Sequence, residues 1–367
     1  MPVAILYHEG LKEYDFGPGH PFRGGRYEAF IRFLRENLSE SGNYRIVASE
    51  PASDEDLLRI CQREYIDFTR EYYRAAHSGL SFNGRFHRYH SSDNRPASGC
   101  GRLEEAARLV VGQAKLAADL VQSGQFEKGI SIGGGIHHAK PSYGEGFCLY
   151  NDVAFAATYL GEAYGLERIL ILDTDAHAGN GTSEYFYSNA SVLFIDLHQD
   201  PRTLYPGTGF VWDVGLGAGK GSTVNIPMPM YAGYDSYRMV LEEIVEPLAQ
   251  EFKPQIIIRN GGSDPHFDDG LTRLGLTVEG FRMIGERVRE MAEACQGRVI
   301  DLIASGYNEK VLPYAWLALI CGLAGFDVAT EEPGPVPQRF QSDPSLDETK
   351  RVIAQVKEHL GEYWRCL

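Results

Sequence analysis

Short runs of apolar residues recur along the chain and alternate with longer windows of helical periodicity. The runs are bounded by Gly, Pro or polar residues, which is typical of buried strands. Expected strands cover residues 3–7, 44–48, 129–132, 169–173, 192–195, 224–226, 256–258 and 299–303. Expected helices cover residues 27–38, 54–77, 101–123, 153–164, 237–252 and 278–295. This alternation predicts an α/β protein with a mostly parallel central sheet covered by helices on both faces.

Three further segments complete the expected organisation. Residues 78–101 are rich in turn-forming residues and longer than uncovered loops usually become, which indicates a functional loop or a lid. Residues 330–344 contain four Pro among acidic residues and resemble a connection. Residues 348–360 show amphipathic spacing, which predicts a final helix that packs back on the domain. We expect a single domain over residues 1–367.

Polar side chains gather where the expected strands end. In chain order, these ends lead to the pair His137 and His138, to Asp173, Asp175 and His177, to Asp196 and His198, to Asp264, and to Tyr307. Ligands of parallel α/β sheets bind outside the carboxyl ends of the strands. The sequence therefore predicts a functional site at this edge.

The stretch from Ile171 to Thr182 reads ILDTDAHAGNGT, a buried strand that runs into a polar loop. Its residues Asp173, Asp175 and His177 are spaced two apart, which keeps them on one face while the backbone stays extended. Burying such groups unpaired costs several kcal/mol, and a cation would offset that cost. Taken alone, the window is equally compatible with an exposed loop rich in Asp, Gly and Asn.

Two carboxylates and one imidazole suit a catalytic metal better than a structural zinc ion. Asp175 and His177 would supply two ligands from one strand end and Asp264 the third, which leaves positions open for water and substrate. Water activated by a metal needs a base, and the adjacent His137 and His138 are suitable near neutral pH. A tyrosine after a glycine in a short loop, as at position 307, would place a phenol against an oxyanion.

Composition narrows the class of protein. Of the 367 residues, 43% are hydrophobic and 23% charged, as in ordinary globular proteins. The net charge of −15, from 50 acidic and 35 basic residues, disfavours nucleic acid and anionic membranes as partners. The six cysteines are scattered without a CxxC pair, and the N-terminus lacks the features of a signal peptide. We expect a cytoplasmic protein with reduced thiols.

A resemblance to a known family rests on six segments spread in order over nearly the whole chain. They are GHPFRGGR (19–26), GGGIHHAKPSYGEGFCLYND (133–152), DTDAHAGNGT (173–182), DLHQDPRTLYPGTG (196–209), NGGSDPHFDDGLTRLGLT (260–277) and SGYN (305–308). The chain resembles the zinc-dependent histone deacetylase superfamily, which also contains acetylpolyamine amidohydrolases and acetoin-utilisation proteins. The resemblance implies the arginase/deacetylase fold, with a central sheet of about eight mostly parallel strands flanked by helices on both faces.

The same resemblance implies a zinc-dependent hydrolase that acts on linear amides. Asp175, His177 and Asp264 match the Zn²⁺ ligands, although this ligand set also accepts Fe²⁺, Co²⁺ or Mn²⁺. Zinc and Tyr307 would polarise the acyl carbonyl, zinc-activated water would attack it, and His138 would act as general base and then as acid toward the departing amine.

Three further catalytic positions follow from the match. His137 matches the histidine that orients water and stabilises the transition state, and Asp173 matches the carboxylate behind it. Asn180 stands behind His138, where a class II-like branch of the family has Asn and another branch has Asp. An amide does not raise the imidazole pKa as a carboxylate does, so the acid limb of the rate profile should lie lower.

Five residues match substrate-binding positions. Gly146 and Phe147 match one wall of an acyl-lysine tunnel, and Tyr205 stands where the family usually has the facing Phe. Asp93 matches the rim carboxylate that grips the substrate backbone. Leu271 occupies the position of the acidic gatekeeper of polyamine-specific relatives, so an acyl-lysine-like or neutral acyl substrate is favoured over a polyamine.

Two structural sites for K⁺ or Na⁺ are also implied. The first matches Asp173, Asp175, His177, Asp196 and Leu197, although the family usually has Ser where this chain has Asp196. The second matches Phe186, Asn189 and Val192 by spacing.

Alternative functions remain on the same sequence. An acetylpolyamine deacylase, a small-molecule deacylase or an esterase would use the same site. A dimanganese ureohydrolase of the arginase type would need a carboxylate where Gly179 stands, and a non-catalytic acyl-binding module would be expected to lack a metal ligand or Tyr307. The expected partner is an acylated amine, with neither nucleic acid nor membrane, and a homo-oligomer stays open.

Overall fold

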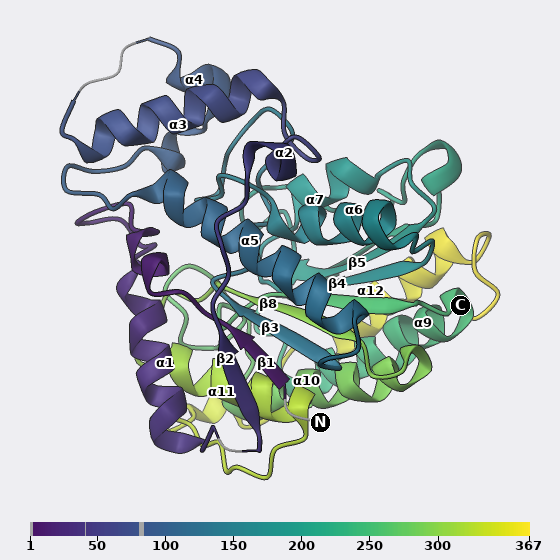
Figure 1. Ribbon diagram of the computed structural model, residues 1–367. Coiled ribbons are helices and arrows are strands. Elements are labelled where there is room, and N and C mark those ends of the chain that lie inside the picture. The colour runs from purple at the N-terminus through teal and green to yellow at the C-terminus, as the bar shows by residue number, and fades with distance from the viewer. Residues whose placement is uncertain (1–2, 41, 81–83) are drawn as a thin grey trace. The chain divides into compact units, whose positions relative to one another are not determined.

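The computed structural model describes residues 3–40, 42–80 and 84–367 (Figure 1). The chain divides into two compact units, Met1–Gly165 and Leu166–Leu367. Within the described ranges there are eight strands, three in the first unit and five in the second, and the strands within each unit pair in parallel. The predicted α/β class is therefore confirmed, whereas the expected single domain stays a prediction.

The first unit contains a parallel group of strands in the order β2–β1–β3. Val3 lies opposite Tyr44, and Ala4 lies opposite Gly129. The strands are β1 (Val3–Leu6), β2 (Tyr44–Val47) and β3 (Lys128–Ile132). The helices are η1 (Glu9–Glu13), α1 (Gly25–Asn37), α2 (Asp54–Leu57), α3 (Arg63–His77), α4 (Phe86–Tyr89), η2 (Ser92–Asn94), α5 (Leu103–Gln122) and α6 (Asp152–Tyr164).

The second unit contains parallel strands in the order β8–β7–β4–β5–β6. Every residue of these strands is buried, as expected for parallel strands covered on both faces. The strands are β4 (Ile169–Asp173), β5 (Val192–Gln199), β6 (Thr223–Met228), β7 (Ile256–Asn260) and β8 (Val299–Ile303). The longer helices are α7 (Asn180–Phe186), α8 (Tyr234–Val240), α9 (Glu246–Phe252), α10 (Val278–Ala292), α11 (Leu312–Ala324) and α12 (Leu346–Leu360), with a π-helical turn at Leu241–Val245 between α8 and α9.

One helix prediction is wrong, and one helix was not predicted. The expected helix over residues 54–77 is broken, because α2 ends before Leu58 and α3 begins after Gln62. The backbone N–H of Gln62 donates to the Pro141 carbonyl at 2.8 Å, so a tertiary contact replaces the helical bond. Helix α11 was not predicted, because it is apolar on nearly all sides and lacks the periodicity of a half-exposed helix.

The proline-rich segment 330–344 is fastened to the second unit by its acidic side chains. The Asp343 carboxylate accepts the backbone N–H groups of Gly233 and Ser236 at 3.0 and 2.7 Å, at the start of α8. Glu332 accepts the N–H of Val278, the first residue of α10. These carboxylates satisfy helix N-termini that local side chains leave uncapped. Across the described ranges, none of the helices combines the length and apolarity required to span a membrane.

Candidate metal centre and active site

Three buried side chains meet at one strand edge of the second unit. Strand β4 pairs with β7 so that Asp173 lies opposite Asn260, and the loops after both strands leave from the same edge. The first loop supplies Asp175 and His177, and the second supplies Asp264. The Nδ1 atom of His177 lies 3.0 Å from Oδ1 of Asp175 and 3.0 Å from Oδ2 of Asp264. One ligand atom from each residue lies within 4.8 Å of the other two.

Burial disfavours the charged forms of the carboxylates in this cluster. Asp175, His177 and Asp264 are only 3%, 8% and 0% exposed. Burial raises the pKa of Asp264, the nearby Asp175 charge adds to the effect, and the value reaches about 7. Burial opposes a charged imidazole, but hydrogen bonds with the two carboxylates raise the pKa of His177 to about 10. The carboxylates therefore require a positive charge, which a proton on His177 or a bound cation can supply.

The donor set fits a divalent metal ion. Two carboxylates and one imidazole are typical of a catalytic centre that keeps a position for water or substrate. Further hydrogen bonds hold the carboxylates: the Ser305 hydroxyl donates to Oδ1 of Asp264 at 2.7 Å, and the backbone N–H of His177 donates to Oδ1 of Asp175 at 2.8 Å. Such contacts fix the orientation of metal ligands.

Tyr307 lies beside the metal centre, in the loop that follows β8. Its ring centroid is 6.3 Å from that of His177, with the two rings nearly perpendicular. The preceding Gly306 has φ 127°, a conformation that L side chains rarely adopt, and a Cβ there would collide with the Ser263 hydroxyl. The backbone N–H of Tyr307 donates to Oδ2 of Asp269 at 2.8 Å.

The predicted histidine pair lies in the first unit, in the loop after β3. The Nε2 atoms of His137 and His138 are 3.2 Å apart, and the side chains are buried. Asp152 holds the loop by accepting the N–H groups of Gly135 and Ile136, at 2.7 Å for the latter. Burial raises the pKa of Asp152 to about 7, although these hydrogen bonds favour its charged form. No role is predicted for Asp152 from the sequence, although it is the last residue of the segment GGGIHHAKPSYGEGFCLYND.

The predicted tunnel-wall residues form a strained turn beside His138. Gly146 and Phe147 have φ values of 60° and 66°, both in the left-handed region. A Cβ on Gly146 would collide with the His138 ring, so only glycine allows this close approach. The Phe147 carbonyl accepts a hydrogen bond from the Tyr14 hydroxyl at 2.8 Å. The Phe147 ring lies edge-on to the His20 ring, with the two centroids 4.6 Å apart.

Asp93 is tied to the same turn. Its Oδ2 accepts the Gly146 N–H at 3.1 Å, and Oδ1 accepts the Ser91 hydroxyl. The neighbouring Asn94 donates from Nδ2 to the Cys148 carbonyl at 2.8 Å. The carboxylate predicted to grip substrate at the rim thus supports the tunnel wall, and substrate contact stays a prediction.

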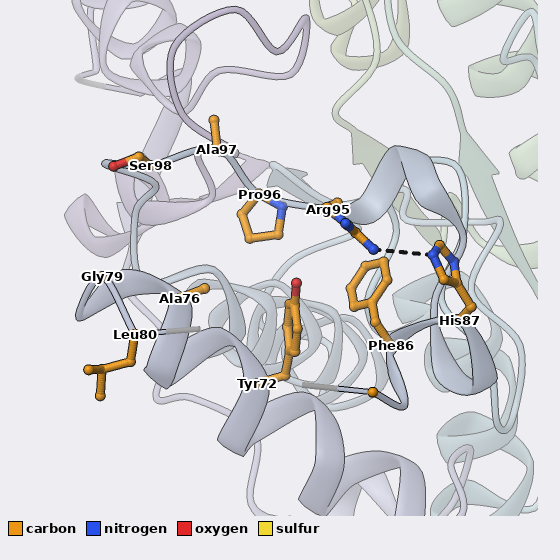
Figure 2. Close-up of a pocket in the computed structure, with 11 residues that line it drawn as sticks. Tyr72, Ala76, Gly79, Leu80, Phe86, His87, Arg95, Pro96, Ala97 and Ser98 are labelled. Atoms are coloured by element: carbon orange, nitrogen blue, oxygen red, sulfur yellow. Dashed lines mark hydrogen bonds between the residues drawn. The ribbon is translucent and has the colours of Figure 1, made fainter. Parts of the chain in front are cut away.

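The chain continues from Asp93 into one wall of a separate cavity of about 510 Å³ in the first unit (Figure 2). Arg95 and Pro96 line one side, and Tyr72 of α3 lines the other. Arg95 donates to Nε2 of His87 at 3.1 Å, and its guanidinium lies over the Phe86 ring at 5.2 Å. None of the described residues that line this cavity is a predicted site residue.

The remaining substrate-binding predictions fall on exposed side chains of the second unit. Tyr205 is 42% exposed and Leu271 is 41% exposed. The Leu271 N–H donates to Oδ1 of Asp269 at 2.8 Å. Both are accessible to a substrate, and their roles stay predictions.

The residues of the first predicted monovalent-cation site are buried around the ends of β4 and β5. Oδ2 of Asp196 accepts the Gly179 N–H at 2.8 Å, and Oδ1 lies 2.9 Å from Nδ1 of His198. Burial raises the pKa of Asp196 despite this histidine. Oδ2 of Asp173 accepts the Asn260 amide at 2.8 Å. Leu197 is buried in β5.

The second predicted cation site lies between α7 and β5. The Phe186 carbonyl accepts the Asn189 N–H at 2.9 Å, and Val192 begins β5. Asn180, the predicted partner of a catalytic histidine, begins α7. Cation binding at both sites, and the role of Asn180, stay predictions.

Comparisons with known proteins agree on one family. A family model described as the histone deacetylase domain matches residues 20–323. A probable deacetylase from Archaeoglobus fulgidus is 39% identical over 378 residues, which cover 100% of this chain and 99% of that protein. The acetoin utilization protein AcuC of Staphylococcus xylosus is 34% identical over 340 residues, or 92% of this chain and 86% of that protein.

A solved structure shows the same fold. The crystal structure of the HDA15 HD domain matches with a TM-score of 0.82 and 25% identity, covering 100% of this chain and 96% of that chain. The parallel strands and the Asp–His–Asp cluster define an α/β protein with a candidate metal centre at its strand ends. The chain belongs to the histone deacetylase family. The resemblance and the arginase/deacetylase fold inferred from the sequence are confirmed.

Proposed function

We propose that this protein is a zinc-dependent deacetylase that removes an acetyl or other acyl group from an amine such as acyl-lysine. The observation that carries the proposal is the buried cluster of Asp175, His177 and Asp264, with the Tyr307 ring 6.3 Å from that of His177. Membership of the histone deacetylase family and the names of the relatives, a probable deacetylase and an acetoin utilization protein, support the reaction class.

Zinc, when held by these three residues, would polarise the acyl carbonyl and lower the pKa of a water molecule. His138 takes the proton of the attacking water and later delivers it to the departing amine nitrogen. His137, whose Nε2 lies 3.2 Å from that of His138, orients the water. The Tyr307 hydroxyl donates to the carbonyl oxygen as negative charge develops there. Fe²⁺, Co²⁺ and Mn²⁺ suit the same donors.

In this proposal, Asp173 and Asn180 are the side-chain partners of the two histidines and influence the pKa values of their imidazoles. Asp173 acts as the carboxylate partner of His137, and Asn180 as the amide partner of His138. Replacing Asn180 by Asp would add a negative charge near His138 and raise its pKa. The acid limb of the rate profile should then move to higher pH in Asn180→Asp.

The proposed substrate is acyl-lysine-like or another neutral acyl compound. Gly146 and Phe147 would line the acyl tunnel opposite Tyr205, and Asp93 would stand at its rim. The apolar Leu271 disfavours a polyamine, whose positive charges would call for an acidic residue there. The enzyme acts in the cytoplasm, and its net charge of −15 disfavours nucleic acid and anionic membranes as partners.

Structural K⁺ or Na⁺ ions form part of the proposal. Backbone carbonyl and carboxylate oxygens suit such hard cations. The first ion would use Asp173, Asp175, His177, Asp196 and Leu197, and the second would use Phe186, Asn189 and Val192.

Hydrolysis of a fluorogenic acetyl-lysine peptide by zinc-loaded protein tests the proposal. Tyr307→Phe should lower kcat by about 10²-fold or more if the hydroxyl donates to the oxyanion. Equal rates in the two proteins would remove Tyr307 from the mechanism. No turnover by the zinc-loaded wild type would refute an acetyl-lysine substrate, and acetylpolyamines, longer acyl amides and esters would then be compared with Fe²⁺, Co²⁺ and Mn²⁺ forms.

A further inference from the structure

The loop that carries the metal ligand Asp264 is bonded to the loop that carries Tyr307. The Ser305 hydroxyl donates to Oδ1 of Asp264 at 2.7 Å, and the Ser263 N–H donates to the Ser305 carbonyl at 2.9 Å. The Tyr307 N–H donates to Oδ2 of Asp269 at 2.8 Å. The two loops follow β7 and β8, which are paired neighbours.

Asp269 is the part of this connection that reaches Tyr307 directly. Its other oxygen, Oδ1, accepts the N–H groups of Leu271 and Thr272 at 2.8 and 3.3 Å. Thr272 in turn donates its hydroxyl to the backbone carbonyl of Asp264. One half-buried carboxylate therefore joins the backbone of the tyrosine loop to the turn that fastens the metal ligand.

The Tyr307 N–H follows directly on a turn of unusual backbone conformation. Gly306 has φ 127°, a conformation that L side chains rarely adopt and that glycine tolerates. A hydrogen bond from a backbone N–H to a carboxylate is stronger than one to a neutral acceptor. The Asp269 carboxylate thus holds the residue that follows this turn.

We propose that Asp269 is a positioning residue that holds the Tyr307 hydroxyl in place for the reacting carbonyl. The inference rests on the proposed deacetylase function, and it assigns Asp269 no contact with substrate or metal. Misplacement of a catalytic group by about 1 Å costs about 10²-fold in rate, so loss of this hydrogen bond is large enough to measure.

A double-mutant cycle on kcat separates positioning from general damage. In zinc-loaded protein, Asp269→Asn should lower kcat by about 10-fold or more with little change in KM. In a Tyr307→Phe background, the same substitution should change kcat by less than about 2-fold, because the hydroxyl that it positions is already gone. An equal loss in both backgrounds would overturn the proposal.

Asp213→Asn is the matched control. Its half-buried carboxylate also accepts a loop backbone N–H, that of Phe210 at 3.0 Å, but among the described residues it makes no hydrogen bond to the tyrosine loop. It should leave kcat within about 2-fold of the wild type. Zinc content and thermal midpoint are measured for each variant, and Asp269→Ser replaces Asp269→Asn if the latter does not fold.

Hydrogen exchange tests the same inference without turnover. The amide of Tyr307 should exchange at least about 10-fold faster in Asp269→Asn than in the wild type, because its acceptor is weakened. Unchanged exchange would overturn the positioning role. If the wild type does not hydrolyse acetyl-lysine but the exchange result holds, the proposed substrate fails while the positioning inference stands.

Discussion

His90 should make the folded protein sensitive to acid. The side chain is fully buried among aromatic rings, with centroids 5.3 Å from those of Tyr65, Tyr73 and Phe86. Its Nε2 lies 3.0 Å from the Thr69 hydroxyl, whereas its Nδ1 has no hydrogen-bond partner within the described part of the chain. Burial lowers the pKa of His90 from 6.5 to about 3. A charged imidazole is thus strongly disfavoured in this position.

The direction of the pH effect follows from which state binds the proton. Above about pH 6.5 the histidine is neutral in both the folded and the unfolded chain, so its protonation does not change the unfolding free energy. Below that value the unfolded chain takes up a proton and the folded chain does not until about pH 3. Stability therefore falls as pH decreases through this window, by about 2 kcal/mol between pH 7.5 and pH 5.

Urea denaturation at pH 7.5 and pH 5 measures this effect when the wild type is compared with His90→Phe. Each protein is compared with itself at the two pH values, so the cost of losing the Thr69 contact cancels. The pH-dependent loss of unfolding free energy should be about 2 kcal/mol smaller in His90→Phe than in the wild type. His359→Gln, an exposed change on α12, serves as the control and should behave like the wild type. Equal losses in the wild type and His90→Phe would refute the reasoning.

Three shorter predictions test other parts of the structure. Gly146→Ala should lower kcat/KM by about 10²-fold because its Cβ displaces the His138 ring, whereas Gly99→Ala, also at positive φ but with open space around it, should not. Chelation should abolish turnover, and added Zn²⁺ at 100 times its Kd should restore it and raise the unfolding free energy by about 2.7 kcal/mol, as calorimetry would show. Asp343→Ala should cost about 1–2 kcal/mol in urea denaturation, since α8 loses its N-terminal acceptor.

The metal cluster could be predicted because its residues closely follow strands of a parallel sheet, which the sequence pattern indicates. Apolar runs mark parallel strands, and parallel strands bring their carboxyl ends to one edge, so Asp175 and Asp264 meet despite their separation in sequence. Helix α11 escaped prediction because a helix buried on nearly all sides shows no apolar stripe. Two residues nevertheless mark the ends of this helix: Pro313 lies in its first turn, and Gly325, at φ 72°, directly follows its last residue.

The supporting carboxylates could not be predicted, because their partners are backbone N–H groups that only the folded chain brings near. Asp93 lies 53 residues from Gly146 in sequence, and Asp269 lies 38 residues from Tyr307. A backbone N–H has no sequence signature, so spacing does not distinguish a carboxylate that binds a metal from one that holds a loop. Residues 264–269, DPHFDD, contain three aspartates, and only the first belongs to the metal cluster.

The loops after β3, β7 and β8 share one physical problem. Gly133 and Gly261, both at positive φ, directly follow β3 and β7, and Gly306, also at positive φ, lies within the loop after β8. The backbone N–H groups of these loops leave the strand ladder and need other acceptors. Asp152 meets this need for the histidine loop and Asp269 for the tyrosine loop, through charge-assisted hydrogen bonds that a neutral side chain would make more weakly. The acidic residues near the site therefore divide into two groups by their partners. The first group, Asp175 and Asp264, faces the metal position, and substitution by Asn should lower metal affinity. The second group, Asp152 and Asp269, holds loop backbone N–H groups, and substitution by Asn should lower kcat while metal content stays unchanged.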